Sequence, residues 1–108
     1  MSGEENTQKG AMLADYHPDE FLESPESQAR LIDDALASGH AGYIADAIGT
    51  VARARGMSEV ARLSGVSRQR LYAALNEAGN PTLETLLAVL KALEIELRAE
   101  IGKKSRAA

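Results

Sequence analysis

The chain has 108 residues, of which 44% are hydrophobic and 26% charged; it carries a formal net charge of −4 and contains no cysteine. A chain of this length usually forms one domain with its own core, and the absence of cysteine excludes disulfides and thiolate metal sites. No apolar run approaches the roughly 18 residues of a membrane helix, and residues 1–12 lack the apolar centre of a signal peptide. We therefore expect a cytoplasmic protein with no membrane partner.

The charge is divided unevenly along the chain. Residues 1–50 contain ten acidic and two basic residues, a formal charge of −8, whereas residues 51–108 contain ten basic and six acidic residues, a charge of +4. Five of the arginines fall within residues 51–72, where Glu59 is the only acid. An acidic half followed by a basic stretch suggests two partners of opposite charge.

The first expected elements are a tail and two helices. Residues 1–12 contain no Val, Ile, Leu or aromatic residue, so we expect them to be disordered. Ser24 and Pro25 predict the N-cap and the first position of a helix that ends at Gly39. A second helix is predicted over residues 41–55, because four apolar residues recur on one face: Ile44, Ala47, Ile48 and Val51.

Three further helices follow. Those over residues 58–64 and 68–76 each begin with a serine at the cap position, Ser58 and Ser67. The last covers about residues 82–93 and opens on a threonine, and its spacing predicts that four leucines face the core: Leu83, Leu86, Leu87 and Leu90. We therefore expect an all-α domain of five helices.

The pattern changes after the last helix. Residues 95–101 alternate between apolar and charged side chains, which predicts one C-terminal β-strand with a buried face. A lone strand has unpaired backbone groups, so we expect it to pair with its copy in a homodimer. A two-fold axis at Leu97 or Ala99 places acidic side chains of one strand opposite basic side chains of the other, whereas an axis at Arg98 places like charges opposite each other. The residues assigned to this dimer strand are Ile95, Leu97, Arg98, Ala99 and Ile101.

The most informative stretch is SEVARLSGVSRQRLYAALNEAGNPTLETL, over residues 58–86. Ala61 is small where a second helix has to cross, and Gly65 permits the positive φ of a sharp turn. Val66 and Leu71 then fill the space between two helices. This spacing is typical of a DNA-binding helix-turn-helix.

The stretch GMSEVARLSGVSRQRLYAALNEAGNPTLETLLAVLKAL resembles the Xre-type, lambda repressor-like regulators, and more narrowly the addiction-module antidote proteins, which are HigA-like antitoxins. The resemblance covers about residues 13–101, which we take as a single domain followed by a flexible tail over residues 102–108. Two features depart from the broader family. The helix before the turn begins late, at Ser58, and Ala74 stands where that family carries a large aliphatic residue. The antidote group tolerates both, so the resemblance favours it over a generic phage repressor.

The resemblance implies a lambda repressor-like fold and a transcriptional repressor that binds its own operator, double-stranded DNA, as a dimer. It also implies an antitoxin that neutralises a small, basic RelE-like ribonuclease toxin. Carried onto this chain, it assigns base reading to one face of the second motif helix: Ser67, Arg68, Gln69, Tyr72 and Ala73. It assigns phosphate contacts to Ser58, Arg70, Asn76 and Asn80.

Other functions have less support in the sequence. No nucleophile motif or phosphate loop indicates an enzyme, and His17 and His40 lack the spacing of metal ligands, so we expect no catalytic residue, metal or cofactor. His40 instead fits the start of a helix. Two alternatives stay open: a solitary prophage-type transcriptional regulator with no toxin partner, and a protein-interaction module in which DNA binding is vestigial. The acidic half supports the second, because an acidic helix is suited to cover the active site of a basic ribonuclease.

Overall fold

The computed structural model describes residues 24–102, and these residues are helical with no strand. Five helices follow one another: α2 (Pro25–Ser38), α3 (Ala41–Arg55), α4 (Met57–Ser64), α5 (Arg68–Ala74) and α6 (Leu83–Ala92). The expected all-α class is confirmed for this part of the chain. The tails expected over residues 1–12 and 102–108 lie outside the described residues, apart from Gly102. None of the helices described is long and apolar enough to span a membrane.

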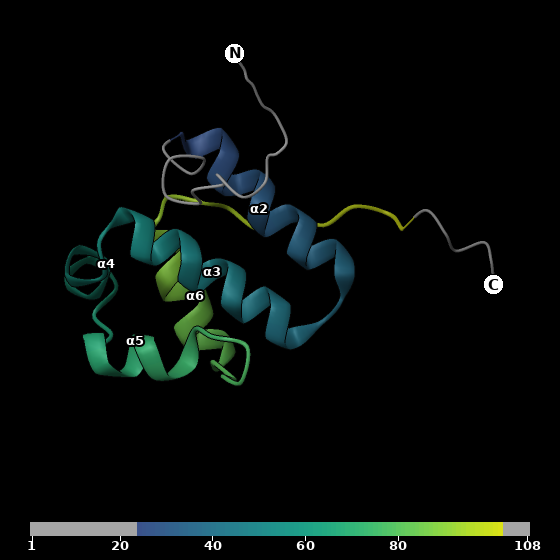
Figure 1. The fold of residues 1–108 in the computed structure, drawn as a ribbon. Coiled ribbons are helices and arrows are strands. Elements are labelled where there is room, and N and C mark those ends of the chain that lie inside the picture. Colours follow the sequence, from purple (N-terminus) through teal and green to yellow (C-terminus); the bar gives the residue numbers. More distant parts are fainter. Residues whose placement is uncertain (1–23, 103–108) are drawn as a thin grey trace, which may run out of the picture.

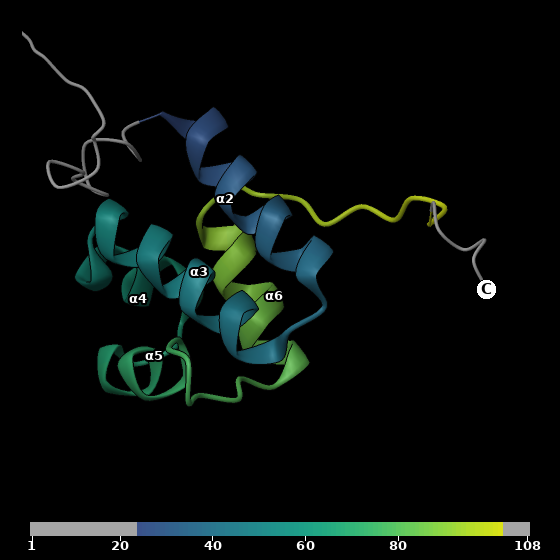
Figure 2. The ribbon, with the colours of Figure 1, turned by 45° about the vertical axis from the view of Figure 1, so that its right-hand side comes forward.

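Helix α3 lies at the centre of the fold. Figure 1 and Figure 2 both place α2 on one side of α3 and α5 on the other. Helix α4 contacts α3, α5 and α6, and it therefore joins α6 to the other helices of the motif. Helix α3 therefore separates the acidic helix α2 from α5, which carries Arg68 and Arg70.

The core draws aliphatic side chains from all five helices and from the ends of two of them. Its largest fully buried side chains are Ile32, Ile48, Val51, Val60, Leu71, Leu75, Val89 and Leu93. Full burial of a side chain of this size contributes about 1.5–3 kcal/mol relative to exposure. This shared core fixes α4 and α5 against the rest of the molecule.

Several helices begin on the side-chain caps that the sequence predicts. The Ser24 Oγ accepts a hydrogen bond from the Ser27 N–H at 3.1 Å, and the Thr82 Oγ1 accepts one from the Thr85 N–H at 3.1 Å. His40 Nδ1 accepts from the Tyr43 N–H at 3.3 Å and so caps α3. Such caps stabilise helix ends by about 0.5–2 kcal/mol.

The predicted cap at Ser58 is wrong. Helix α4 begins at Met57, and its N-cap is Gly56, which has a φ of 108° and no side chain to supply the bond. The Gly56 N–H donates to the Ala52 carbonyl oxygen at 2.9 Å, so a single residue connects α3 to α4. Because glycine adopts a positive φ at little cost, this sharp connection replaces a capped start. Ser58 is left one position inside the helix, with its hydroxyl available for other contacts.

Two of the four leucines that were predicted to face the core do not. Leu83 is 68% exposed and Leu87 is 48% exposed, whereas Leu90 is 2% exposed and Leu86 is partly buried. Helix α6 carries more apolar residues than the surrounding helices cover. Its outer side therefore exposes two leucines beside Glu84 and Lys91.

The strand predicted over residues 95–101 is absent from the single chain. Residues 95–102 have no regular secondary structure and run as an extended segment away from the helices (Figure 1). A strand needs a neighbour for its backbone hydrogen bonds, and the part of the chain that the structure describes provides none. The strand is therefore a proposal that applies only to a homodimer, in which a second chain would provide the missing neighbour.

Candidate nucleic-acid interface

Helix α4, the turn over residues 65–67 and helix α5 form a helix-turn-helix unit. Gly65 has a left-handed φ of 77°, and its N–H donates to the Ala61 carbonyl oxygen at 3.0 Å, which ends α4. Val66 is 7% exposed and Leu71 is fully buried, and both belong to the core cluster. Ala61 packs against the same cluster. All four positions have the roles that their spacing predicts.

Helix α3 supports the far end of α5 at very close range. A Cβ atom on Gly49 would lie 2.1 Å from the Leu75 carbonyl oxygen, a distance that no side chain tolerates. Two turns earlier on α3, a Cβ atom on Gly42 would lie 2.6 Å from the Glu77 carbonyl oxygen. The two glycines let backbone pack directly on backbone, which fixes the orientation of α5.

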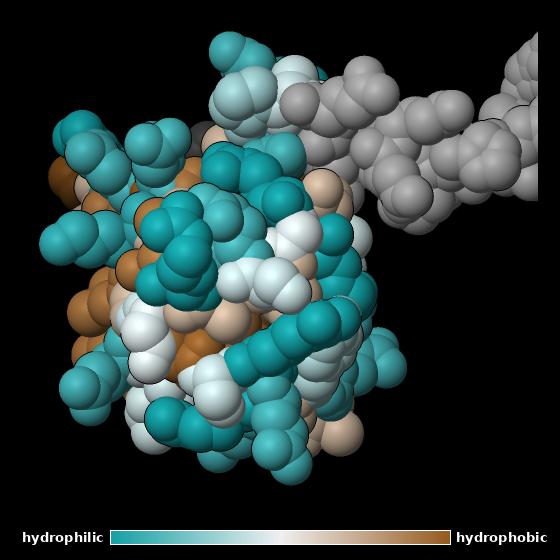
Figure 3. Space-filling model, turned by 90° about the vertical axis from the view of Figure 1, so that its left-hand side faces the viewer, coloured by the Kyte–Doolittle hydropathy of each residue, from teal (hydrophilic) through white to brown (hydrophobic). Residues whose placement is uncertain are grey.

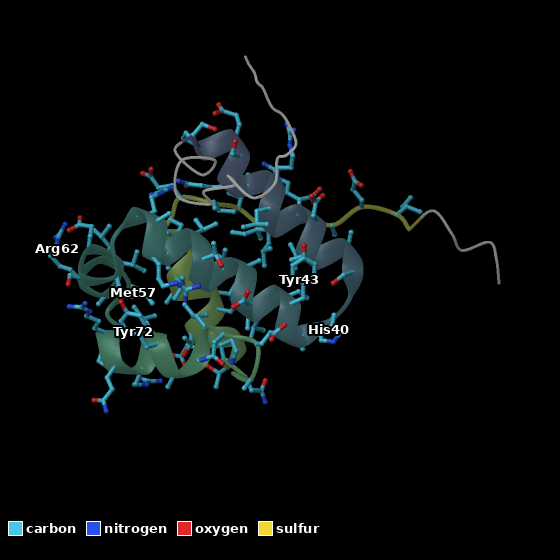
Figure 4. The ribbon with its side chains drawn as sticks, in the orientation of Figure 1. His40, Tyr43, Met57, Arg62 and Tyr72 are labelled. Carbon is cyan, nitrogen blue, oxygen red and sulfur yellow. The ribbon has the colours of Figure 1, made fainter. Side chains whose placement is uncertain are left out.

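Arg68, at the start of α5, contacts two neighbours. Its Nη1 donates to the Ser58 Oγ at 3.2 Å, and its guanidinium carbon lies 5.7 Å from the centre of the Tyr72 ring. Figure 4 shows Tyr72 on α5, where its side chain is 43% exposed. A cation–π contact at an exposed site is worth about 0.5–1 kcal/mol. The structure thus brings together three residues that the sequence assigned separately to bases and phosphate.

The other assigned residues around α5 are exposed: Ser67, Gln69, Arg70, Ala73 and Asn80. The Ser67 Oγ accepts from the Arg70 N–H at 3.1 Å, which confirms the predicted cap of α5. Within residues 24–102, the side chains of Gln69 and Arg70 make no hydrogen bond or ion pair. Their donors are therefore available to a ligand.

Asn76 has a structural role that sequence reasoning missed. Its Nδ2 donates to the Tyr72 and Ala73 carbonyl oxygens at 2.8 and 3.3 Å, and its Oδ1 accepts from the Ala78 N–H at 2.9 Å. The side chain therefore satisfies backbone groups at the end of α5, which stops at Ala74, two residues before its predicted end at 76. An asparagine just after a helical run is the sequence signal for such a stop.

Arg55 belongs to the basic stretch but serves the fold. Its Nε donates to the Gln28 Oε1 at 2.8 Å, and its Nη2 donates to the Leu93 carbonyl oxygen at 2.6 Å. These two bonds connect the ends of α2, α3 and α6. No periodicity in the sequence indicates such a contact, because its partners are 27 and 38 residues away.

Arg62 also has a partner. It forms an ion pair with Glu59 on α4, with 3.1 Å between its Nε and the Glu59 Oε1, at the outer edge of the helix (Figure 4). The hydrogen bond from Arg62 lowers the pKa of the Glu59 carboxyl. The pair is solvent-exposed and its charges compensate each other. Arg68 and Arg70 therefore supply the positive charge at the start of α5.

Comparison with known protein families gives one match that covers most of the chain. Residues 12–101 match the family described as "Probable addiction module antidote protein". A protein of Haemophilus influenzae described as an uncharacterized protein is 39% identical over 88 residues, which cover 82% of this chain and 91% of the relative. No solved structure gives a significant match.

Proposed function

The chain belongs to the family of probable addiction module antidote proteins, and on this premise we propose that it is an antitoxin that binds operator DNA and represses its own operon. Within that family we place it among the HigA-like, Xre-type regulators with a lambda repressor-like domain. The cytoplasmic location expected from the sequence is part of this proposal, because operator DNA lies there. An antidote acts by binding other molecules, so we propose no catalytic role.

The observation that carries DNA binding is the start of α5. Arg68 is oriented by Ser58 and Tyr72, and the neighbouring Gln69 and Arg70 have free donors. Arginine reads guanine and glutamine reads adenine through paired hydrogen bonds in the major groove. A helix that presents these side chains from a rigid support is suited to reading bases.

The proposed contacts follow from this placement. Base edges are read from one side of α5 by Ser67, Arg68, Gln69, Tyr72 and Ala73. Phosphates are contacted around that helix by Ser58, Arg70, Asn76 and Asn80. Asn76 contributes less than the others, because its amide is engaged at the end of α5.

We place the DNA-binding form in a homodimer. Residues 95–101 of two chains pair as antiparallel strands, with the two-fold at Leu97 or Ala99, so that acidic and basic side chains oppose each other. The two α5 helices then lie about 34 Å apart and contact half-sites one turn apart on a two-fold operator.

The toxin surface is proposed on the opposite side of the molecule. Helix α2 exposes Glu26, Asp33 and Asp34, and α3 separates it from α5 (Figure 2). DNA phosphate repels an acidic surface, whereas a small, basic RelE-like ribonuclease is attracted to it. The molecule is then able to hold toxin and operator at the same time.

The test is a gel shift with the DNA upstream of the protein's own gene, combined with inspection of the neighbouring gene. We expect retardation that a large excess of unrelated DNA does not abolish, and a neighbouring gene for a small basic protein that co-purifies with this chain. Equal affinity for operator and unrelated DNA at matched salt contradicts DNA recognition and favours the interaction module. Specific binding with no toxin partner favours the solitary regulator.

A further inference from the structure

The basic stretch contains one acid, Glu59, among its five arginines. Arg53 donates to a threonine hydroxyl at 3.3 Å, Arg68 to a serine hydroxyl at 3.2 Å, and Arg55 to an amide oxygen and a backbone carbonyl oxygen. These partners are neutral, so the three guanidinium groups keep their full positive charge. In the part of the chain that the structure describes, Arg62 is the only arginine of the stretch that pairs with a carboxylate. The acid of the basic stretch therefore acts on one arginine.

Glu59 and Arg62 are held together by two contacts on α4. The Arg62 Nε donates to the Glu59 Oε1 at 3.1 Å, and its Nη2 donates to the Oε2. Such a fork of two donors on two carboxylate oxygens adds geometric specificity to the attraction of the charges. The hydrogen bond from Arg62 lowers the pKa of the Glu59 carboxyl, which is therefore ionised at neutral pH. The pair carries no net charge where an arginine alone would carry one.

The pair lies beside the start of α5. Arg62 follows Ser58 by four residues, so both occupy the same side of α4, about 6 Å apart along its axis. The Ser58 hydroxyl contacts Arg68, the first residue of α5. Figure 4 places Arg62 and Tyr72 at the same end of the molecule, and Figure 3, which faces that end, shows hydrophilic side chains across its middle. DNA that contacts the start of α5 therefore comes within reach of Arg62.

A free arginine at this place would add a contact to DNA phosphate. One such contact raises the affinity for DNA by about eightfold for each tenfold drop in salt, and it does so for every sequence alike. Glu59 opposes this gain. Exposed ion pairs are weak and open readily, but a carboxylate one turn away stays within the ~10 Å Debye length of a phosphate that Arg62 reaches, and repels it. The cancellation therefore does not require an unbroken pair.

We propose that Glu59 is a specificity-determining residue of the DNA-binding surface, because it keeps Arg62 from holding DNA of any sequence. Specificity is a difference between two affinities, and a repulsive group improves it when it weakens the wrong complex more. Unrelated DNA is held by phosphate contacts and binds in many positions, including those that bring a phosphate closest to Arg62. Base contacts hold operator DNA in one position. The inference rests on the proposed operator binding and adds a residue that limits binding elsewhere.

Removing the charge of Glu59 tests the inference. Glu59→Gln keeps the size of the side chain and should raise the affinity for an unrelated duplex about three- to eightfold in about 0.1 M salt, with a salt slope steeper by about one. Operator affinity should rise by a smaller factor, so the ratio of the two affinities falls. Asp34→Asn is the matched control, because it removes one exposed acidic charge from α2, which α3 separates from α5, and it should leave both affinities at the wild-type level. Fluorescence anisotropy measures the affinities, and circular dichroism checks that each variant folds.

A second variant tests whether Arg62 is the group that Glu59 controls. Adding Arg62→Gln to Glu59→Gln removes both charges of the pair, and it should return the affinity for unrelated DNA and its salt slope to the wild-type level. A double variant that keeps the raised affinity overturns the role of Arg62. An unchanged Glu59→Gln affinity for unrelated DNA, or an equal rise on operator and unrelated DNA, overturns the specificity role. In these cases the wild type still prefers its operator, whereas a wild type without that preference contradicts the proposed function itself.

Discussion

The start of α5, with Ser67 and Arg68, which we propose as the recognition surface, and the outer side of α6, with Leu83 and Leu87, are both exposed, but their groups are engaged differently. In the recognition surface, Arg68 already contacts Ser58 and Tyr72, and Ser67 caps the helix. On the outer side of α6, Leu83 and Leu87 are exposed to solvent. Oriented polar groups suit a ligand that keeps much of its water, as DNA does, whereas exposed leucines suit a partner that excludes water.

The two surfaces are mechanically linked through α4. Ser58 near its start contacts Arg68 of the proposed recognition surface, and Leu63 near its end is 52% exposed. Helix α4 therefore connects the start of α5 to an exposed leucine at its own end.

The largest expected effect is a loss of stability when a buried leucine, and not an exposed one, is shortened to alanine. Leu71→Ala should lower the free energy of unfolding by about 2–5 kcal/mol, because Leu71 is the fully buried residue by which α5 packs on the core. Leu63→Ala should change it by less than about 1 kcal/mol, because Leu63 is 52% exposed. Urea unfolding at a concentration that populates the monomer measures both. Equal losses would show that Leu63 is part of the monomer's core.

A proline in the C-terminal segment should break the dimer while sparing the recognition surface. Leu97→Pro removes a backbone donor from the paired strands, so we expect a monomer in sedimentation and operator affinity reduced at least about tenfold through loss of bivalent binding. Gly102→Pro, beyond the paired residues, is the control and should behave as wild type. A Leu97→Pro dimer of undiminished stability would place the interface elsewhere.

Removing the ring under Arg68 should have a moderate effect on DNA binding. Tyr72→Leu deletes the contact at 5.7 Å and should reduce operator affinity by about 0.5–1 kcal/mol, or roughly two- to fivefold. Tyr72→Phe keeps the ring and should retain most of the affinity. A loss of the same size in Tyr72→Phe would mean that the hydroxyl, and not the ring, makes the useful contact. Titration by fluorescence anisotropy distinguishes the two.

The smallest effect on DNA is expected at α2. Charge reversal by Asp33→Lys and Asp34→Lys should leave operator affinity unchanged or slightly stronger, because both acids are exposed on α2, which α3 separates from α5. The same double variant should neutralise the toxin less well. A large loss of DNA affinity with an unchanged circular dichroism spectrum would end the proposed division between the two sides.

Local signals in the sequence predicted much of this fold. Ser24, Ser67 and Thr82 cap helices as predicted, and the turn at Gly65 has the expected geometry, because each depends on neighbours within about four residues. Ser58 was misassigned as a cap because Gly56 connects two helices without needing one. Local patterns therefore predict the starts of helices better than the connections between helices.

Contacts between residues far apart in the chain could not be predicted from the sequence. The periodicity of α6 did not show which side the other helices cover, so Leu83 and Leu87 were placed inside. The partners of Arg55 are far away in the chain, and the bonds of Asn76 to the end of α5 depend on where that helix stops. Side chains whose partners lie far away in the chain are thus harder to predict than caps and turns, which depend on near neighbours.

The central claim is that α5 reads operator DNA, and paired arginine variants test it most directly. In titrations at several matched salt concentrations, Arg68→Ala should cost about 1–3 kcal/mol and relax the preference at one operator position. Arg70→Ala should weaken binding to all sequences alike and reduce the salt slope by about one. If both variants keep wild-type operator affinity and salt dependence, α5 is not the recognition helix.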